Sequence, residues 1–152
     1  MSEFRSEITI ARPIAEMFEF LCHPANVLLV TPPNWKMRLV EAPEGLQLGS
    51  RLIVEVGRWG LPQRITSEVT SFEPPVLFVD TQRQGPFRKW IHTHRFEPAP
   101  NGTRLLDVVE FEPPGGMLGF IVTAQAIERE LKAVFAYRGP KLRELLESPQ
   151  AP

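Results

Sequence analysis

The sequence predicts an α+β fold. A curved antiparallel sheet of seven strands should wrap around a long C-terminal α-helix, with two short helices between the first two strands. Two observations lead to this fold. Six strand-like segments separated by turn signals follow residue 36, and such regular spacing is typical of an antiparallel meander. The last segment, 117–148, is amphipathic and long enough to need a wide apolar surface beneath it.

The N-terminal part predicts one strand and two short helices. Phe4, Ile8 and Ile10 alternate with polar residues, as in a half-buried strand. Apolar residues at helical spacing then predict a helix over 14–21, which a histidine–proline pair ends. The stretch 25–30 allows a second short helix before the next proline cluster.

Six further strands should follow, because clusters of proline and glycine bound six segments of strand length. These segments are 36–42, 51–58, 64–72, 76–84, 87–97 and 103–112. The aromatic residues Trp35, Trp59 and Phe87 are expected in the core or at its rim. The loop 59–62 is expected to be an ordinary hairpin connection.

The C-terminal segment predicts a helix of roughly 45 Å, because apolar residues recur on one face at helical spacing. They are Phe120, Ala124, Ile127, Leu131, Val134, Leu142 and Leu145. Pro140 removes one helical hydrogen bond, so it should kink the helix or split off its last turns. We expect residues 1–148 to form one domain and residues 149–152 to form a frayed tail.

Composition narrows the classes of function. The net charge is −1 and there is no basic block, which argues against nucleic-acid binding. The chain has neither an apolar signal core nor a run of about 20 apolar residues. A cytoplasmic monomer or homodimer without a membrane span is therefore expected. Cys22 is the only cysteine and lies in an apolar helical stretch, where a buried, inert thiol is expected.

Pairing of the last two strands is predicted from the proline-rich turn that joins them. This turn pairs His92 with Asp107 on the inner face of the sheet and Lys89 with Glu110 on the outer face. A slip of two residues would pair His94 with Asp107 instead and keep both faces.

An inward imidazole should therefore meet an inward carboxylate, formed by His92 or His94 with Asp107. The pair would orient a ligand, act as a general acid and base, or simply fix the strand register. Arg138 falls on the inner face of the helix. It could pair with Asp107, meet an anionic ligand group at the cavity mouth, or extend to solvent.

Other site chemistries find less support in the sequence. The His-x-His pair with Asp107 could bind a metal, but such a pair is common and zinc sites use better-defined ligand sets. The sequence also has no glycine-rich phosphate loop, no His-Glu-x-x-His and no Gly-x-Ser-x-Gly motif. We therefore expect neither a metal nor a cofactor.

The strand before this cluster leaves two orientations open. If a two-residue hairpin follows residue 84, then Val79, Thr81 and Arg83 face inward. If the turn has three residues, then Asp80 and Gln82 face inward.

A resemblance to a known family rests on residues 85–96, Gly-Pro-Phe-Arg-Lys-Trp-Ile-His-Thr-His-Arg-Phe, with Gly102-Thr103 and Pro114-Gly115-Gly116 after them. With the order of elements, this resembles the START/polyketide-cyclase-like superfamily (SRPBCC) over nearly the whole chain, and its small bacterial members most. The resemblance implies a helix-grip fold, in which a curved sheet grips a C-terminal helix around an apolar cavity. It also favours Asp80 and Gln82 facing inward.

The superfamily does not determine one function, because its members transfer lipids, bind hormones, cyclise polyketides or assist chaperones. We expect binding or transport of a hydrophobic small molecule; the alternatives are a cyclase or dehydrase that uses His92, His94 and Asp107, and a protein-interaction module. The expected ligand-binding residues are Trp90, His92, His94, Asp107, Val109, Phe111, Ile127, Leu131, Val134 and Arg138.

Overall fold

The computed structural model describes residues 1–58 and 60–147. One antiparallel sheet has the strand order β1-β7-β6-β5-β4-β3-β2. Its strands are β1 (Ser2–Ile10), β2 (Arg38–Glu41), β3 (Arg51–Val56), β4 (Gln63–Glu73), β5 (Leu77–Gln84), β6 (Lys89–Ala99) and β7 (Gly102–Glu112). The helices are α1 (Ile14–Leu21), α2 (Pro24–Leu29), the 3-10 turn η1 (Pro33–Trp35), α3 (Leu118–Ile121) and α4 (Ala124–Glu147). The predicted sheet, the two early helices and the long C-terminal helix are all present.

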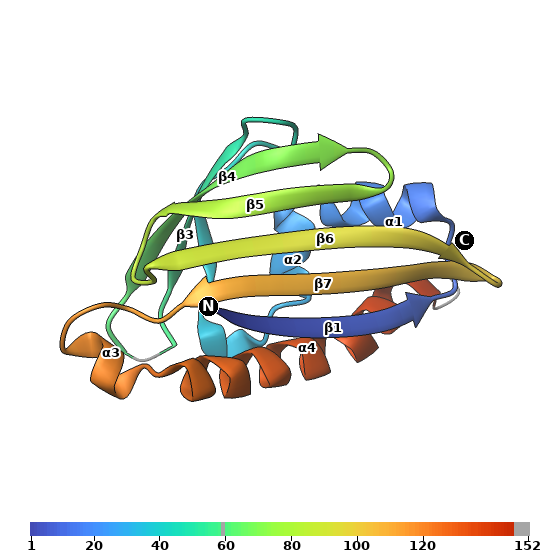
Figure 1. Cartoon of the computed structure of the whole chain (residues 1–152). Coiled ribbons are helices and arrows are strands. Elements are labelled where there is room, and N and C mark those ends of the chain that lie inside the picture. Colours follow the sequence, from blue (N-terminus) through green and yellow to red (C-terminus); the bar gives the residue numbers. More distant parts are fainter. Residues whose placement is uncertain (59, 148–152) are drawn as a thin grey trace.

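The sheet curves so that its inner face holds the helices, with α4 running along β1 (Figure 1). One apolar cluster joins α1 to the sheet: Phe18 packs edge-on against Phe78 and Phe96. A second cluster joins the first half of α4 to β7 through Ile127, Leu131 and neighbours. Polar side chains lie between these two clusters, and they form the site described below.

The long helix begins later than the sequence predicts, at Ala124 and not at 117. The backbone of Val122 leaves the helical region, with φ −94° and ψ 82°. The Thr123 hydroxyl then accepts a hydrogen bond from the Ala126 N–H at 3.2 Å, the bond that an N-cap residue makes. The threonine therefore starts a new helix after the short helix α3.

Two further expectations about this segment need correction. Phe120 was expected on the buried face, yet its side chain is 86% exposed on α3. Of the two effects expected of Pro140, a kink or the loss of the last turns from the helix, the second does not occur, because α4 continues through Pro140 to Glu147. Contacts with the end of β1 hold these turns, including the bond from the Ala11 N–H to the Glu147 carboxylate at 2.8 Å. Trp59, Ser148 and the predicted tail lie outside the described residues.

The register of β6 and β7 follows the two-residue slip. Ala99 pairs with Gly102, so the turn has only two residues, and Asn101 takes a left-handed φ of 64° at the second of them, after Pro100, as in a type II turn. The predicted pairing of Lys89 with Glu110 is therefore wrong, since Lys89 lies opposite Glu112. The assignment of the inner and outer faces is unchanged by an even shift.

None of the helices in the described part of the chain combines the length and apolar character needed to cross a membrane. Cys22 is buried beside α1, and burial, with a smaller effect of Glu19, raises the pKa of its thiol to about 12. The thiol is therefore protonated at neutral pH, as an inert core cysteine should be.

Candidate functional site

A cavity of about 240 Å³ lies between the inner face of the sheet, α2 and α4. Its walls are largely apolar and include Val54 of β3, Ile65 of β4 and Val109 of β7. Leu131 and Val134 cover it from α4. A cavity of about 150 Å³ holds benzene in another protein, so this one has room for a ligand larger than one aromatic ring.

Four titratable side chains form a connected network at one wall of this cavity. His92 Nε2 lies 2.8 Å from Asp107 Oδ1, and His94 Nε2 lies 2.8 Å from Asp80 Oδ2. His94 Nδ1 also faces Asp107 Oδ1 at 3.4 Å, an electrostatic contact and not a well-aligned hydrogen bond. The two imidazole rings stack, with centroids 3.7 Å apart. The strands place this network, because His92 and His94 are alternate residues of β6 and so share one face.

Arg138 brings α4 into the network. Its Nη1 lies 3.8 Å from Asp107 Oδ1, and its guanidinium stacks over the Phe135 ring at 4.9 Å from the centroid. Arg138 and Phe135 separate the cavity from an outer groove of about 440 Å³ between β1 and α4. Of the three placements expected for Arg138, pairing with Asp107 is the one observed.

For each of the two carboxylates, burial and ion pairing shift the pKa in opposite directions. Burial raises the pKa of Asp107, but contacts with His92 and His94 and the nearby charge of Arg138 outweigh it and hold the pKa well below its usual range. Burial likewise raises the pKa of Asp80, and the hydrogen bond from His94 more than offsets it, so the pKa is lowered. Both carboxylates are therefore ionised at neutral pH.

The pKa values of the two histidines are shifted in opposite directions. Burial and the neighbouring charge of His94 lower the pKa of His92 in spite of its bond to Asp107. Burial also lowers the pKa of His94, but contacts with Asp107 and Asp80 outweigh it, and the pKa is raised. When His94 is protonated, its charge and that of Arg138 balance the charges of the two carboxylates. Such balance makes the network tolerable in an apolar interior.

The family model for polyketide cyclase/dehydrase and lipid transport matches residues 1–144. The chain belongs to this family. The helix-grip fold, with its apolar cavity under the C-terminal helix, is the architecture that the sequence resemblance implied.

Sequence relatives of this family member include two uncharacterized proteins of Mycobacterium tuberculosis, MT0096 and Rv0088. Each is 26% identical over 111 residues, which is 72% of this chain. The chain spans about half the length of these curated relatives, 48%.

Solved structures of similar fold come from distant organisms. Protein CV1439 of Chromobacterium violaceum has a TM-score of 0.75 at 14% identity and covers 97% of this chain and 98% of its own. Major latex-like protein 151 of Panax ginseng has a TM-score of 0.65 at 15% identity, covering 91% and 95%. Identities this low are evidence for the fold alone.

In this structure, most of the residues predicted for the site lie together around the cavity, but not all. Trp90, His92, His94, Val109, Leu131, Val134 and Arg138 line the cavity. Phe111 and Ile127 do not: they belong to the buried apolar cluster under the first half of α4. Asp107 is not in the lining either, because it lies behind the histidines with a side chain only 2% exposed.

The orientation left open for β5 is now clear. Asp80 and Gln82 both line the cavity, and Gln82 Nε2 donates to the Phe87 carbonyl at 2.7 Å. Asp107 contacts both His92 and His94. The two contacts that the sequence analysis treated as alternatives are therefore both present. The cavity walls from α2, β3 and β4 were not predicted, because residues such as Val27 and Val54 carry no signal beyond being apolar.

Asp80, His92 and His94 each offer a ligand atom within 4.8 Å of the others, a donor set that metal ions accept. However, the rings stack at 27°, so their in-plane lone pairs do not converge on one point. Both Nε2 atoms are also held by carboxylates. This arrangement favours a hydrogen-bonded network over a metal centre.

Proposed function

We propose that the protein binds a hydrophobic small molecule with one polar group, in the cavity between the sheet and α4. The observation that carries this proposal is a largely apolar cavity whose lining includes a few polar side chains, among them Asp80, His92 and His94. Ligand pockets typically combine apolar walls with a few polar groups that orient the ligand. Membership of a family described by polyketide cyclisation and lipid transport supports the same class of ligand.

His92 is the group that would meet the polar end of the ligand. A neutral imidazole donates one N–H, and here Nε2 donates to Asp107. Nδ1 is then an acceptor, and it has no hydrogen-bond partner among residues 1–58 and 60–147. A ligand hydroxyl could donate to it, while the apolar remainder lies against Leu131 and Val134.

A second function, a cyclase- or dehydrase-type enzyme, is favoured by one specific observation. Asp107 holds His92 by Nε2, an arrangement in which a carboxylate orients an imidazole base. A neutral His92 could remove a proton beside a carbonyl group, as ring closure and dehydration both require.

Thermal shift with a library of hydrophobic metabolites tests the binding proposal. A ligand at a hundredfold excess over its Kd should stabilise the protein by about 2.7 kcal/mol. Val134→Phe should fill the cavity and abolish the shifts. The control, Ala133→Phe, changes an exposed neighbour on α4 and should keep them. Equal shifts in both variants, with native circular dichroism, would place the ligand elsewhere.

His92→Gln separates the two functions. In a binding protein it should change affinity for hydroxyl-bearing ligands by about 1 kcal/mol, the net contribution of one hydrogen bond. In an enzyme it should remove turnover while binding persists. Mass spectrometry of β-hydroxy carbonyl probes incubated with each protein would detect loss of water. Native mass spectrometry of protein purified from its own host would identify the ligand that it carries.

A further inference from the structure

Large apolar side chains are exposed together at one end of the molecule. Phe120 is 86% exposed, Met117 85% and Ile121 78%, all in or beside the short helix α3. Leu61, in the loop between β3 and β4, is 72% exposed. These are the four most exposed large apolar residues in the described part of the chain. Exposed apolar groups gathered in this way mark interaction surfaces.

The loop that carries Leu61 lies at the same end of the molecule as the helix α3. Arg58, at the start of the loop, forms an ion pair at 3.6 Å with Glu130 of α4, and α3 directly precedes α4. Figure 1 shows the loop and α3 at the same end of the molecule. Leu61, Met117, Phe120 and Ile121 are called the apolar tips below.

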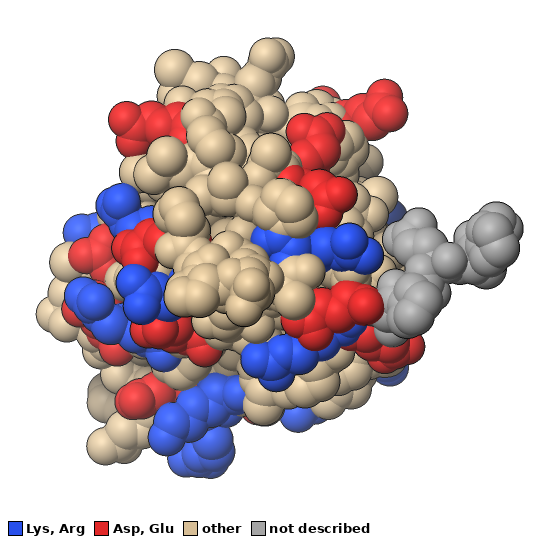
Figure 2. All heavy atoms as spheres, turned by 90° about the vertical axis from the view of Figure 1, so that its right-hand side faces the viewer, with Lys and Arg blue, Asp and Glu red and all other residues tan. Residues whose placement is uncertain are grey.

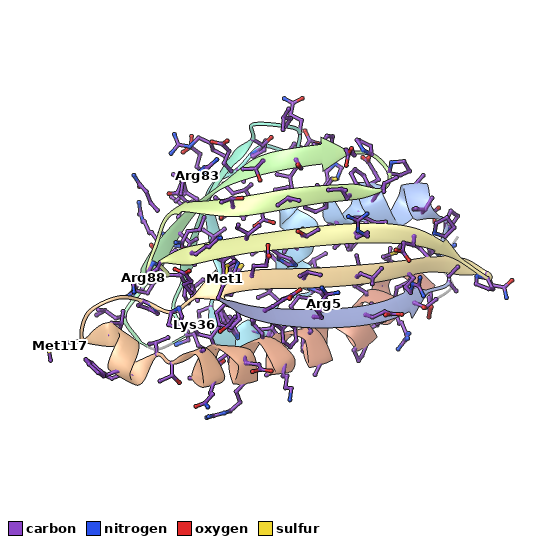
Figure 3. The ribbon with its side chains drawn as sticks, in the orientation of Figure 1. Met1, Arg5, Lys36, Arg83, Arg88 and Met117 are labelled. Atoms are coloured by element: carbon purple, nitrogen blue, oxygen red, sulfur yellow. The ribbon has the colours of Figure 1, made fainter. Side chains whose placement is uncertain are left out.

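A cationic residue lies beside each of the two segments that carry the apolar tips. Atoms Cδ and Nε of Arg88 lie 3.7 Å from the position of a β-carbon built on Gly115, just before α3. The side chain of Lys36 lies 3.3 Å from the equivalent position on Gly57, where the loop begins. Figure 3 shows Arg88 and Lys36 at the same end as Met117.

These two cations are available to contact anionic groups of a partner. Both are exposed, and neither has a carboxylate within 4.0 Å among residues 1–58 and 60–147. At the opposite end, Lys and Arg side chains lie next to Asp and Glu side chains (Figure 2). Arg104, for example, pairs there with both Glu97 and Glu7.

We propose that this end of the protein docks on a membrane surface that contains anionic lipids. The apolar tips would enter the boundary between headgroups and acyl chains, and Arg88 and Lys36 would contact lipid phosphates. Apolar side chains next to basic ones are what interfacial binding requires. A protein partner would need a continuous complementary surface of about 800 Å², whereas two separate projecting segments, the loop and α3, fit a deformable lipid layer. None of these six residues lines the cavity, although Trp35, Met37 and Phe87, which adjoin the two cations in sequence, do.

Co-sedimentation with phosphatidylcholine vesicles, with and without phosphatidylglycerol, tests the proposal. Wild type should bind the anionic vesicles, and binding should weaken as salt increases. Phe120→Ser should lower the partition coefficient about tenfold, and Arg88→Glu should lower it at least about fivefold.

Matched controls lie elsewhere on the surface. Leu48→Ser removes another apolar residue, which is 65% exposed, and Arg95→Glu reverses another exposed cation that forms no ion pair with the described residues. Both should bind like wild type. Val134→Phe, which fills the cavity, should also leave vesicle binding unchanged. Failure of the membrane proposal can therefore be told apart from failure of the ligand-binding proposal.

Three results would overturn the proposal. One is no sedimentation with either vesicle. Another is equal binding of wild type to neutral and anionic vesicles, together with no effect of Arg88→Glu on binding. The third is a wild-type dimer in light scattering that Phe120→Ser dissociates, since the apolar tips would then be a contact between two copies of the chain.

Discussion

His94 and Asp107 lie directly opposite each other on β6 and β7, with His94 Nδ1 3.4 Å from Asp107 Oδ1. The same oxygen lies 2.8 Å from His92 Nε2 and 3.8 Å from Arg138 Nη1. One carboxylate oxygen therefore faces three nitrogen groups from two different elements. Asp107 is the centre of the network, although it does not line the cavity itself.

Asp107→Asn should destabilise the protein by about 3–5 kcal/mol, because it leaves buried cations without their counter-charge. Urea unfolding measures the loss. Asp80→Asn is the matched control: its side chain is 23% exposed, against 2% for Asp107, and within the described part of the chain it forms an ion pair with one residue, His94. It should cost clearly less. Equal losses in the two variants would contradict the central role of Asp107.

The two stacked histidines should titrate on opposite sides of the ordinary pKa of 6.5. His94 should stay protonated above this pH because of its two carboxylates, and His92 should stay neutral below it. Nitrogen-detected NMR titration of the imidazoles reads both directly. The reverse order would mean that Asp80 does not hold His94 in solution.

The same pKa shifts predict opposite effects of pH on stability. The raised pKa of His94 stabilises the fold below pH 6.5, and this contribution is lost as pH rises through the folded-state value. The lowered pKa of His92 destabilises the fold as pH falls below 6.5. The unfolding free energy of wild type relative to His94→Gln should therefore shrink on the alkaline side. Relative to His92→Gln, it should shrink on the acidic side.

Leu131→Ala should cost about 2–5 kcal/mol, because Leu131 is 5% exposed and packs in the cluster under α4. The adjacent Lys132 is exposed, so Lys132→Ala should change stability by less than about 0.5 kcal/mol. Chemical denaturation of both variants provides the comparison. A change as small in Leu131→Ala would show that this face of α4 is not packed as the structure has it.

Gly102→Ala should destabilise the protein by at least about 2 kcal/mol. A β-carbon at Gly102 would stand 2.1 Å from the Ile10 carbonyl oxygen, so the close approach of β1 and β7 would have to open. Gly45→Ala is the control, because its β-carbon would meet only His23 Nε2, at the ordinary distance of 3.8 Å. Similar melting temperatures for both variants would rule out this close approach.

Much of the fold could be predicted from local patterns. Alternation along residues 90–96 correctly places Trp90, His92 and His94 on the inner face, since strand periodicity does not depend on distant contacts. The register could not be predicted in the same way. It depends on whether the turn at Asn101 has two residues or more, and the proline-rich sequence there is compatible with both.

The start of the long helix shows the other limit. Phe120 continues the apolar spacing of the helix, so periodicity alone extends the helix too far. The side chain of Thr123 decides the start through its bond to the Ala126 N–H. Threonine followed three residues later by alanine lacks the acidic or amide partner that makes a capping motif recognisable in a sequence.

Candidate-site residues were predictable where they lie on regular strands and not where curvature brings distant segments together. His92, His94 and Asp107 belong to adjacent strands, and their contact follows from pairing. The apolar walls from β3 and β4 depend on how strongly the sheet bends, which no residue in those strands encodes alone.

The pairing of β1 with β7 has a consequence for biosynthesis. Ser2 to Ile10 find their partners only in residues 103–111, and Glu147 then binds the backbone of Ala11. During synthesis, β1 must therefore wait for its partner strand until residues 103–111 have left the ribosome. Nascent chains stopped before β7 should expose the edge of β1 and bind chaperones, and β1 can join the sheet only once β7 has emerged.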